Sequence, residues 1–183
     1  MKSQRTRFLL QLAVVLGAIL FAFGSVLAQS TTYNYAPGTD FAKYKTYKWV
    51  TIKGAEQPNQ LVDQQIKQAI DAQLAAKGMT KTDSDNADLD VAYQPSISQQ
   101  QQWSTYGTGG GWRMGGGMAT TTSTTLQVGT LGLDFYDPAS KQLVWRGSVT
   151  KTLDPSAKPD KREKNLNKAV AKLLKNFPPK SKS

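Results

Sequence analysis

The sequence predicts an α+β fold: an antiparallel or mixed sheet of about four to five strands with two amphipathic helices packed on one face. Three observations predict this class. Two segments repeat apolar residues at steps of three and four, which is the period of a helix. Several others alternate apolar and polar residues or are rich in β-branched and aromatic side chains, as strands are. The chain of 183 residues suits one domain, whose sheet would cover both helix stripes.

The first 28 residues are predicted to be a cleavable signal peptide. Three basic residues precede an apolar run over 8–23, and Val26 and Ala28 stand at the two small-residue positions that a signal peptidase reads. A retained anchor is the alternative, but a run of sixteen residues is short for a membrane span. Cleavage would leave residues 29–183 as a single α+β domain. Since residue 29 is Gln and not Cys, we expect no lipid anchor.

The exported chain is expected to begin with a loosely ordered lead-in at 33–37. Residues 44–52 predict a strand, because all of them are β-branched, aromatic or lysine. A helix is predicted from Leu61 to Lys77, with Asn59 as its N-terminal cap and Gly78 in the left-handed conformation that follows a helix end.

A short strand is expected at 79–82 and an alternating one at 89–93, which Pro95 would end. The stretch that follows is rich in Gln, then Gly, then Thr, a composition with too little apolar surface to offset its ordering entropy. We therefore expect a flexible loop at about 94–125, whose Thr-rich end could start the next strand.

An antiparallel hairpin is predicted from the two alternating segments 131–136 and 143–150. Asp137-Pro138 supplies the first two positions of a type I turn between them. The apolar residues at 126 and 128 are in the opposite phase to those of 131–136, which indicates a bulge near Gly129.

The last predicted helix begins at Asp160, where Glu163 completes a capping box. It carries an uninterrupted apolar stripe that belongs against the sheet: Leu166, Ala169, Val170, Leu173, Leu174 and Phe177. Burying the six side chains would contribute roughly 9 kcal/mol of gross transfer free energy. Pro178 ends the helix.

The composition excludes several classes of chemistry. The chain contains no Cys and no His, so thiol nucleophiles, Cys–His and Ser–His–Asp triads, zinc fingers and disulfide scaffolds lack an essential residue. No cofactor is expected. The acidic segment 83–90 resembles a calcium loop at first sight, but Ala87, Asp88 and Gln94 stand where a ligand, a glycine and a glutamate are required. A solvated turn is the favoured interpretation.

Asp134 and Asp137 could form a catalytic carboxylate pair at a strand end. Acid–base catalysis needs two carboxylates in different environments around one cleft. Asp137 already has a role in the turn and Asp134 is expected on the polar face, so a carboxylate-dependent hydrolase is the weaker hypothesis and we expect no enzyme.

The glycine-rich segment 107–117 does not fit a phosphate-binding loop, because it lacks the G-x-G-x-x-G spacing and no helix follows. Its neighbouring aromatics are better candidates for binding. Trp103, Tyr106 and Trp112 could stack on a ligand or a protein partner, or fold back onto the sheet. Arg146 is a further surface candidate, whereas Trp145 is expected in the core.

A row of lysines lies opposite the apolar stripe of the last helix, including Lys164, Lys168, Lys172 and Lys175. Residues 151–183 hold ten Lys or Arg against three acidic residues, so the basic character of the exported chain is local to its C-terminus. Such a face can contact an anionic membrane or cell wall, or simply keep the helix soluble. A nucleic-acid partner is not expected in an exported protein.

Five segments, in one fixed order, resemble a family of bacterial envelope proteins, the "domain of unknown function 4136". They are residues 40–49, 74–79, 87–93, 143–147 and 169–179. The resemblance implies a secreted α+β domain, often lipid-anchored, with no established activity and no catalytic residues to carry over. This chain departs from it by lacking the lipid-bearing cysteine.

The sequence thus leads to an exported, non-enzymatic accessory protein of the envelope that acts by binding. Periplasmic location is expected first, with full secretion or outer-membrane association as alternatives. Its partner would be an envelope protein or an anionic surface. The alternative function is a peripheral membrane- or cell-wall-binding protein that uses the basic face of the C-terminal helix.

Overall fold

A computed structural model describes residues 29–55, 57–107 and 119–179 of the chain. It confirms the α+β class and shows a mixed sheet of six strands, one more than the upper expectation, in the order β1-β6-β5-β4-β2-β3. The strands are β1 (Ser30–Tyr35), β2 (Thr46–Trp49), β3 (Thr80–Lys81), β4 (Leu89–Gly107), β5 (Ala119–Asp137) and β6 (Gln142–Leu153). The helical elements are η1 (Phe41–Lys43), α2 (Gln60–Ala75), α3 (Pro159–Leu173) and η2 (Leu174–Asn176). The predicted signal peptide lies outside the described residues.

The additional strand is β1, which replaces the expected lead-in. It pairs antiparallel with β6 at one edge of the sheet, from Ser30 opposite Thr150 to Tyr35 opposite Trp145. Four of its six residues are exposed, without regular alternation. The two-residue period by which a half-buried strand is recognised is therefore missing from its sequence.

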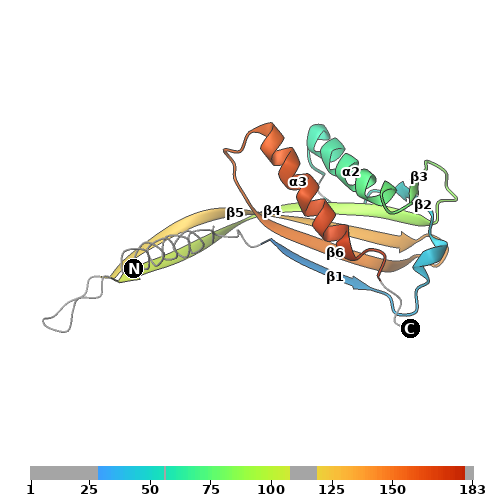
Figure 1. The fold of residues 1–183 in the computed structure, drawn as a ribbon, viewed down its shortest axis with the longest axis horizontal. Coiled ribbons are helices and arrows are strands. Elements are labelled where there is room, and N and C mark those ends of the chain that lie inside the picture. The colour runs from blue at the N-terminus through green and yellow to red at the C-terminus, as the bar shows by residue number, and fades with distance from the viewer. Residues whose placement is uncertain (1–28, 56, 108–118, 180–183) are drawn as a thin grey trace, which may run out of the picture.

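Both helices pack on the same face of the sheet, as predicted (Figure 1). The Asn59 side chain accepts a hydrogen bond from the Val62 amide at the start of α2, and Gly78 has a φ of 81° after its end. Helix α3 starts at Pro159 with Lys158 as its N-cap and makes no side-chain capping bond there, so the expected cap at Asp160 is wrong. Proline at the first helical position has its φ preset for the helix and needs no hydrogen-bond partner.

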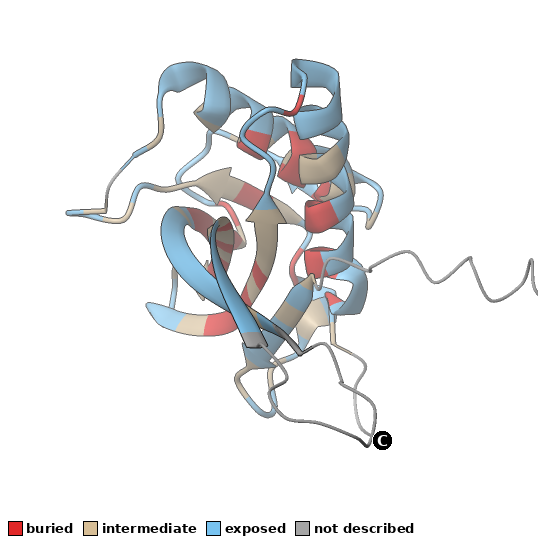
Figure 2. Ribbon diagram, turned by 90° about the vertical axis from the view of Figure 1, so that its left-hand side faces the viewer, coloured by how far each residue is buried: buried red, intermediate tan, exposed pale blue. Residues whose placement is uncertain are grey.

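The core lies between the helices and the sheet, where the buried positions gather in Figure 2. Phe177, just after η2, contacts the rings of Phe41, Phe135 and Trp145 at centroid distances of 5.9, 4.4 and 5.3 Å. The apolar stripe of the last helical segment is therefore used to hold α3 and η2 on the sheet.

Strands β4 and β5 extend far beyond this body. They pair in one unbroken register from Asp90 opposite Tyr136 to Gly107 opposite Ala119. Strand β2 accompanies β4 only as far as Val91, and β6 accompanies β5 only as far as Gln127. Residues 100–107 and 119–126 thus form a two-stranded projection, here named the arm, which leaves the body on the left of Figure 1.

The arm corrects the expected loop at about 94–125. Residues 94–107 and 119–125 are paired strand, and residues 108–118 lie outside the described part of the chain. Two paired strands satisfy one another's inner backbone groups, so polar side chains can occupy them without being buried. The bulge expected near Gly129 is also displaced: the register between β5 and β6 shifts between Phe135 and Tyr136 instead.

Pro95 does not end β4, because its nitrogen faces away from β5. The Val50 amide donates to the Val91 carbonyl at 2.8 Å, so the backbone groups of Val91 point toward β2. Alternate residues of a strand direct their N–H and C=O groups to the same side. The nitrogen of Pro95 therefore faces the side on which β2 has already ended, where no ladder hydrogen bond is lost.

Candidate functional site

The arm exposes large side chains and carries no charge. Trp103 is 66% exposed and Ile97, at the base of the arm, is 70% exposed. Between Val91 and Leu133 the sequence has a single charged residue, Arg113. Figure 2 shows the arm toward the viewer, pale blue along most of its length. Of the three aromatics proposed from the sequence, Trp103 is thus exposed, the side chain of Tyr106 is not described, and Trp112 lies outside the described residues.

The outer edge of β4 in the arm is a free hydrogen-bonding edge. By the same alternation that explains Pro95, the backbone groups of Gln101, Trp103 and Thr105 point away from β5. No strand of the described sheet pairs with them there. A row of unpaired N–H and C=O groups is a template for another strand.

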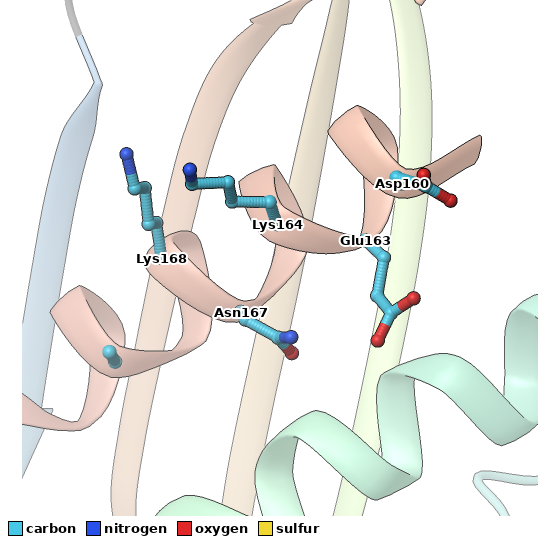
Figure 3. Close-up of a pocket in the computed structure, with 6 residues that line it drawn as sticks. Asp160, Glu163, Lys164, Asn167 and Lys168 are labelled. Atoms are coloured by element: carbon cyan, nitrogen blue, oxygen red, sulfur yellow. The ribbon is translucent and has the colours of Figure 1, made fainter. Parts of the chain in front are cut away.

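The lysines predicted on α3 are all exposed. Figure 3 shows Lys164 and Lys168 directed to one side of the helix, with Glu163 and Asn167 directed to the other. An open hollow of about 500 Å³ lies beside these four residues and Asp160. Lys172 donates a hydrogen bond to the Gln29 carbonyl at 3.0 Å, while Lys175 follows in η2.

Lys151, which is not part of the predicted lysine row, belongs to the same basic surface. Burial, and then repulsion from Lys168 and Lys161, holds the pKa of Lys151 below its usual value. Lys161 is itself paired with Asp154 at 3.1 Å. Lys151 lies on β6, outside the helical repeat of α3, so only the packing of the helix on the sheet reveals its place in this surface.

Arg146 is exposed, as expected, but its guanidinium group is paired with a carboxylate. Its Nε and Nη2 atoms donate to the two carboxylate oxygens of Asp134 at 2.6 and 2.7 Å, and Asp134 is only 5% exposed. The pair sits directly across the β5–β6 ladder, on the face opposite the helices. A shallow pocket of about 300 Å³ surrounds it, lined also by Gly132, Gln94 and Ser148.

Asp137 is held at the far end of β5. Its carboxylate accepts hydrogen bonds from the amides of Ala139 and Ser140, which confirms its role in the turn, and from Lys43 Nζ and Tyr44 Oη. The Ser140 amide, then Lys43 and Tyr44, hold the pKa of this carboxyl well below its ordinary value. Asp134 and Asp137 therefore have separate partners and do not converge on one cleft.

The acidic segment before β4 connects this strand to β2 through its side chains. Asp88 accepts from the amides of Lys45 and Thr46, and Asp85 pairs with Lys48 at 3.1 Å. Within the residues that the structure describes, no three metal-ligating side chains gather in one place. No helix of the same residues has the length and hydropathy needed to cross a membrane.

Comparison with known proteins gives a family and a fold. The family described as "Domain of unknown function (DUF4136)" matches residues 30–179. No curated protein matches the chain. A PDZ domain protein from Parabacteroides distasonis is similar in structure, with a TM-score of 0.56 and 13% identity over 84% of this chain, which spans only 37% of that protein. PelC from Paraburkholderia phytofirmans, solved as a dodecamer, has a TM-score of 0.50 and 12% identity, covering 80% of this chain and 95% of PelC.

Proposed function

The chain belongs to the DUF4136 family, and from that premise we propose that it is an exported, non-enzymatic accessory protein of the bacterial envelope that acts by binding through its arm. The observation that carries the proposal is the arm itself, a neutral two-stranded projection with an exposed tryptophan and an unpaired edge. Export is proposed from the signal-like first 28 residues, and periplasmic location is proposed ahead of full secretion or outer-membrane association.

The arm has few contacts that would stabilise it by itself. A two-stranded hairpin is at best marginally stable in water, because it buries little apolar surface. Trp103 and Ile97 are nevertheless exposed on the arm and at its base. Large aromatic side chains are enriched at protein interfaces, since they bury much area for little lost conformational freedom. A partner that covers the arm would therefore gain both the aromatic surface and the free backbone groups.

The arrangement of the carboxylates supports a non-enzymatic role. Asp134 is paired with Arg146, and Asp137 with a turn and two side chains, so both carboxylates already have structural partners. Turnover in a broad substrate screen that disappears in Asp134→Asn would reverse this part of the proposal.

The test is site-specific photo-cross-linking in intact cells. A photoreactive amino acid at position 103 is expected to give discrete cross-linked products with envelope components, and the same group at Ser140, in the exposed turn at the opposite end of β5, is expected to give none. Equal labelling at both positions, or none at position 103, would contradict binding through the arm.

A second candidate function is contact of the basic helix face with an anionic surface. The burial of Val170, Leu173 and Leu174 excludes insertion of the α3 stripe into a bilayer while the fold is intact, so the contact would be electrostatic. Each lysine near an anionic membrane contributes about 1 kcal/mol. Three together would change the affinity by about 100-fold.

Co-sedimentation with anionic vesicles and with purified cell-wall sacculi tests this candidate. The variant replaces Lys164, Lys168 and Lys175 with Gln and leaves Lys172, which bonds the Gln29 carbonyl. The control replaces three exposed lysines away from α3, Lys45, Lys53 and Lys141, with Gln. Salt-sensitive pelleting that the first variant loses and the control keeps would support the basic face; identical pelleting of both would exclude it.

A further inference from the structure

We propose that the partner of the arm is the arm of a second copy of this chain, joined edge to edge through the free edge of β4. The inference rests on the proposed function, because it names the partner of the same surface. The two β4 strands would run antiparallel, so that two arms form one four-stranded ribbon between two separate bodies.

The free edge is long and regular. The register between β4 and β5 has no bulge from Asp90 to Gly107, so the outward-facing groups form an even row. Beyond Val91, β4 has no neighbour in the described sheet on its outer side. An edge of this kind is competent to pair over its whole length without rearrangement of the hairpin.

The usual devices against edge pairing are missing from the arm. Natural sheets protect free edges with charged side chains, prolines, bulges or a very short strand. The paired residues 96–107 and 119–130 contain no charge, no proline and no bulge. By contrast, the edge strand β3 is two residues long and one of them is Lys81. The free edge of β4 in the arm can therefore pair with another strand, whereas the edge at β3 is protected from pairing.

The uncharged side chains of the arm are better suited to pair with a second arm than with a charged partner. Each glutamine amide has both a donor and an acceptor, so facing glutamines satisfy one another, as in stacked ladders. An isologous pair centred on Gln101 would set Gln101 opposite its own copy, Trp103 opposite Gln99, and Thr105 opposite Ile97. Each exposed apolar side chain would then lie against a side chain of the other copy.

The length of the arm removes the electrostatic cost of joining two basic chains. Gln101 is ten residues beyond Val91, the last residue of β4 that pairs with β2. At about 3.3 Å per residue this places the pairing centre about 33 Å from that point. Two bodies held at that distance are separated by several Debye lengths at physiological salt, so their like charges are screened.

The first experiment is a charge swap at Gln101, read by sedimentation velocity and light scattering of the exported chain. The wild type is expected to be a reversible dimer. Gln101→Lys and Gln101→Glu each place like charges face to face and are expected to weaken the dimer about fivefold. A 1:1 mixture of the two variants is expected to restore a dimer that contains one copy of each.

Two controls separate this edge from other surfaces. Ser140→Lys adds the same charge in the turn at the far end of β5, and Tyr33→Lys adds it on β1, an edge strand at the opposite side of the sheet from β4. Both are expected to leave the dimer intact. Loss of the dimer in Tyr33→Lys, with both Gln101 variants dimeric, would overturn the proposal and assign the interface to β1.

A proline at the same position tests the backbone bonds. Gln101→Pro removes an outward N–H without touching the ladder to β5, in the phase that Pro95 already occupies in this strand. It is expected to abolish the dimer, whereas Gln101→Ala, which keeps the N–H, is expected to retain it. Equal behaviour of the two variants would contradict edge pairing.

The outcome is distinguishable from that of the proposed function. A wild type that is monomeric up to about 100 μM, yet cross-links from position 103 to another envelope component, would overturn self-pairing and leave binding by the arm standing. A monomer that also fails to cross-link would remove both. Cross-links from position 103 only between copies of the chain would support self-pairing directly.

Discussion

Asp88 connects the start of β2 to the start of β4 through hydrogen bonds. Its Oδ2 atom accepts hydrogen bonds from the amides of Lys45 and Thr46 and from the Thr46 hydroxyl, each at 2.8 Å. The two amides, followed by the hydroxyl, lower the pKa of Asp88 from its usual 3.8. A carboxyl whose pKa falls on folding stabilises the native state above its unfolded pKa, and that contribution is lost as the pH falls through the folded pKa.

Asp88→Asn is therefore expected to reduce the free energy of unfolding by about 1–2 kcal/mol at pH 7. The difference between the variant and the wild type should shrink below a pH of about 4, because protonation removes the same carboxylate from the wild type. Urea denaturation at pH 7 and pH 3 measures it. A difference that is the same at both values would show that the charge of Asp88 plays no part.

Arg146 and Asp134 form a pair of unequal exposure, with side chains 59% and 7% exposed. Arg146→Met is expected to cost about 2 kcal/mol, because it leaves a buried carboxylate with only a long 3.4 Å contact to the Tyr136 hydroxyl. The double variant with Asp134→Val should recover part of that loss, since no unpaired charge remains. Urea unfolding of the three variants gives the coupling; strictly additive losses would contradict it.

For single residues, the sequence predicts the roles that depend on close neighbours along the chain. Asn59, Gly78 and Asp137 could be assigned from sequence, because a cap or a turn depends on neighbours within a few positions. The partner of Arg146 could not be assigned, since it depends on the β5–β6 register, which shifts between Phe135 and Tyr136. The place of Lys151 could not be assigned either, because its neighbours Lys161 and Lys168 reach it only after α3 packs on the sheet.

Among the elements, β6 and α3 pack closely at Gly147. Of the described glycines, this one has the least room for a Cβ atom. A Cβ placed on Gly147 would collide with the Trp145 ring, with Cζ2 at 2.9 Å, and with Leu173 Cδ1 at 2.8 Å. Trp145 is fully buried and is stacked on Phe135, so the ring has no room to retreat. The absence of a side chain at position 147 is what lets the helix approach the sheet.

Gly147→Ala is accordingly expected to lower the free energy of unfolding by about 1–3 kcal/mol through overpacking. Gly132→Ala is the matched control in the neighbouring strand, because its Cβ would meet nothing closer than the Gln94 carbonyl oxygen at 3.5 Å. Thermal unfolding followed by circular dichroism compares them. Equal melting temperatures for the two variants would show that α3 can shift to make room.

The elements that were predicted correctly are those with one buried face. Helices α2 and α3 and the β5–β6 hairpin each alternate apolar and polar residues at their own period. Strand β1 and the arm, by contrast, have no consistently buried face, so their sequences carry polar residues without a period. Their pairing is set by backbone hydrogen bonds to strands chosen by the rest of the fold, which a local pattern does not encode.

At the scale of the molecule, the body is expected to be stable without the arm. The hydrophobic core contains no residue between Tyr93 and Leu131. Replacing residues 99–127 with Asn-Gly would connect Ser98 to its ladder partner Val128 by a two-residue turn, which suits a hydrogen-bonded pair. The shortened chain is expected to melt within a few degrees of the wild type and to be monomeric.

Scanning calorimetry and sedimentation of the shortened chain check the two halves of this prediction. A body that no longer folds would show that the arm supports the core. A shortened chain that still dimerises would place the interface elsewhere.

The position of β1 has a consequence for the order in which the chain acquires its structure. Ser30 pairs with Thr150, so the first described strand to leave the ribosome must wait until residues 145–150 have been synthesised before its partner exists. The β4–β5 and β5–β6 hairpins need only local closure and can form long before, as short sequence separations favour rapid pairing. The first described strand to be synthesised is thus the one that completes this edge of the sheet, and until β6 is present its backbone hydrogen-bonding groups have no partner strand.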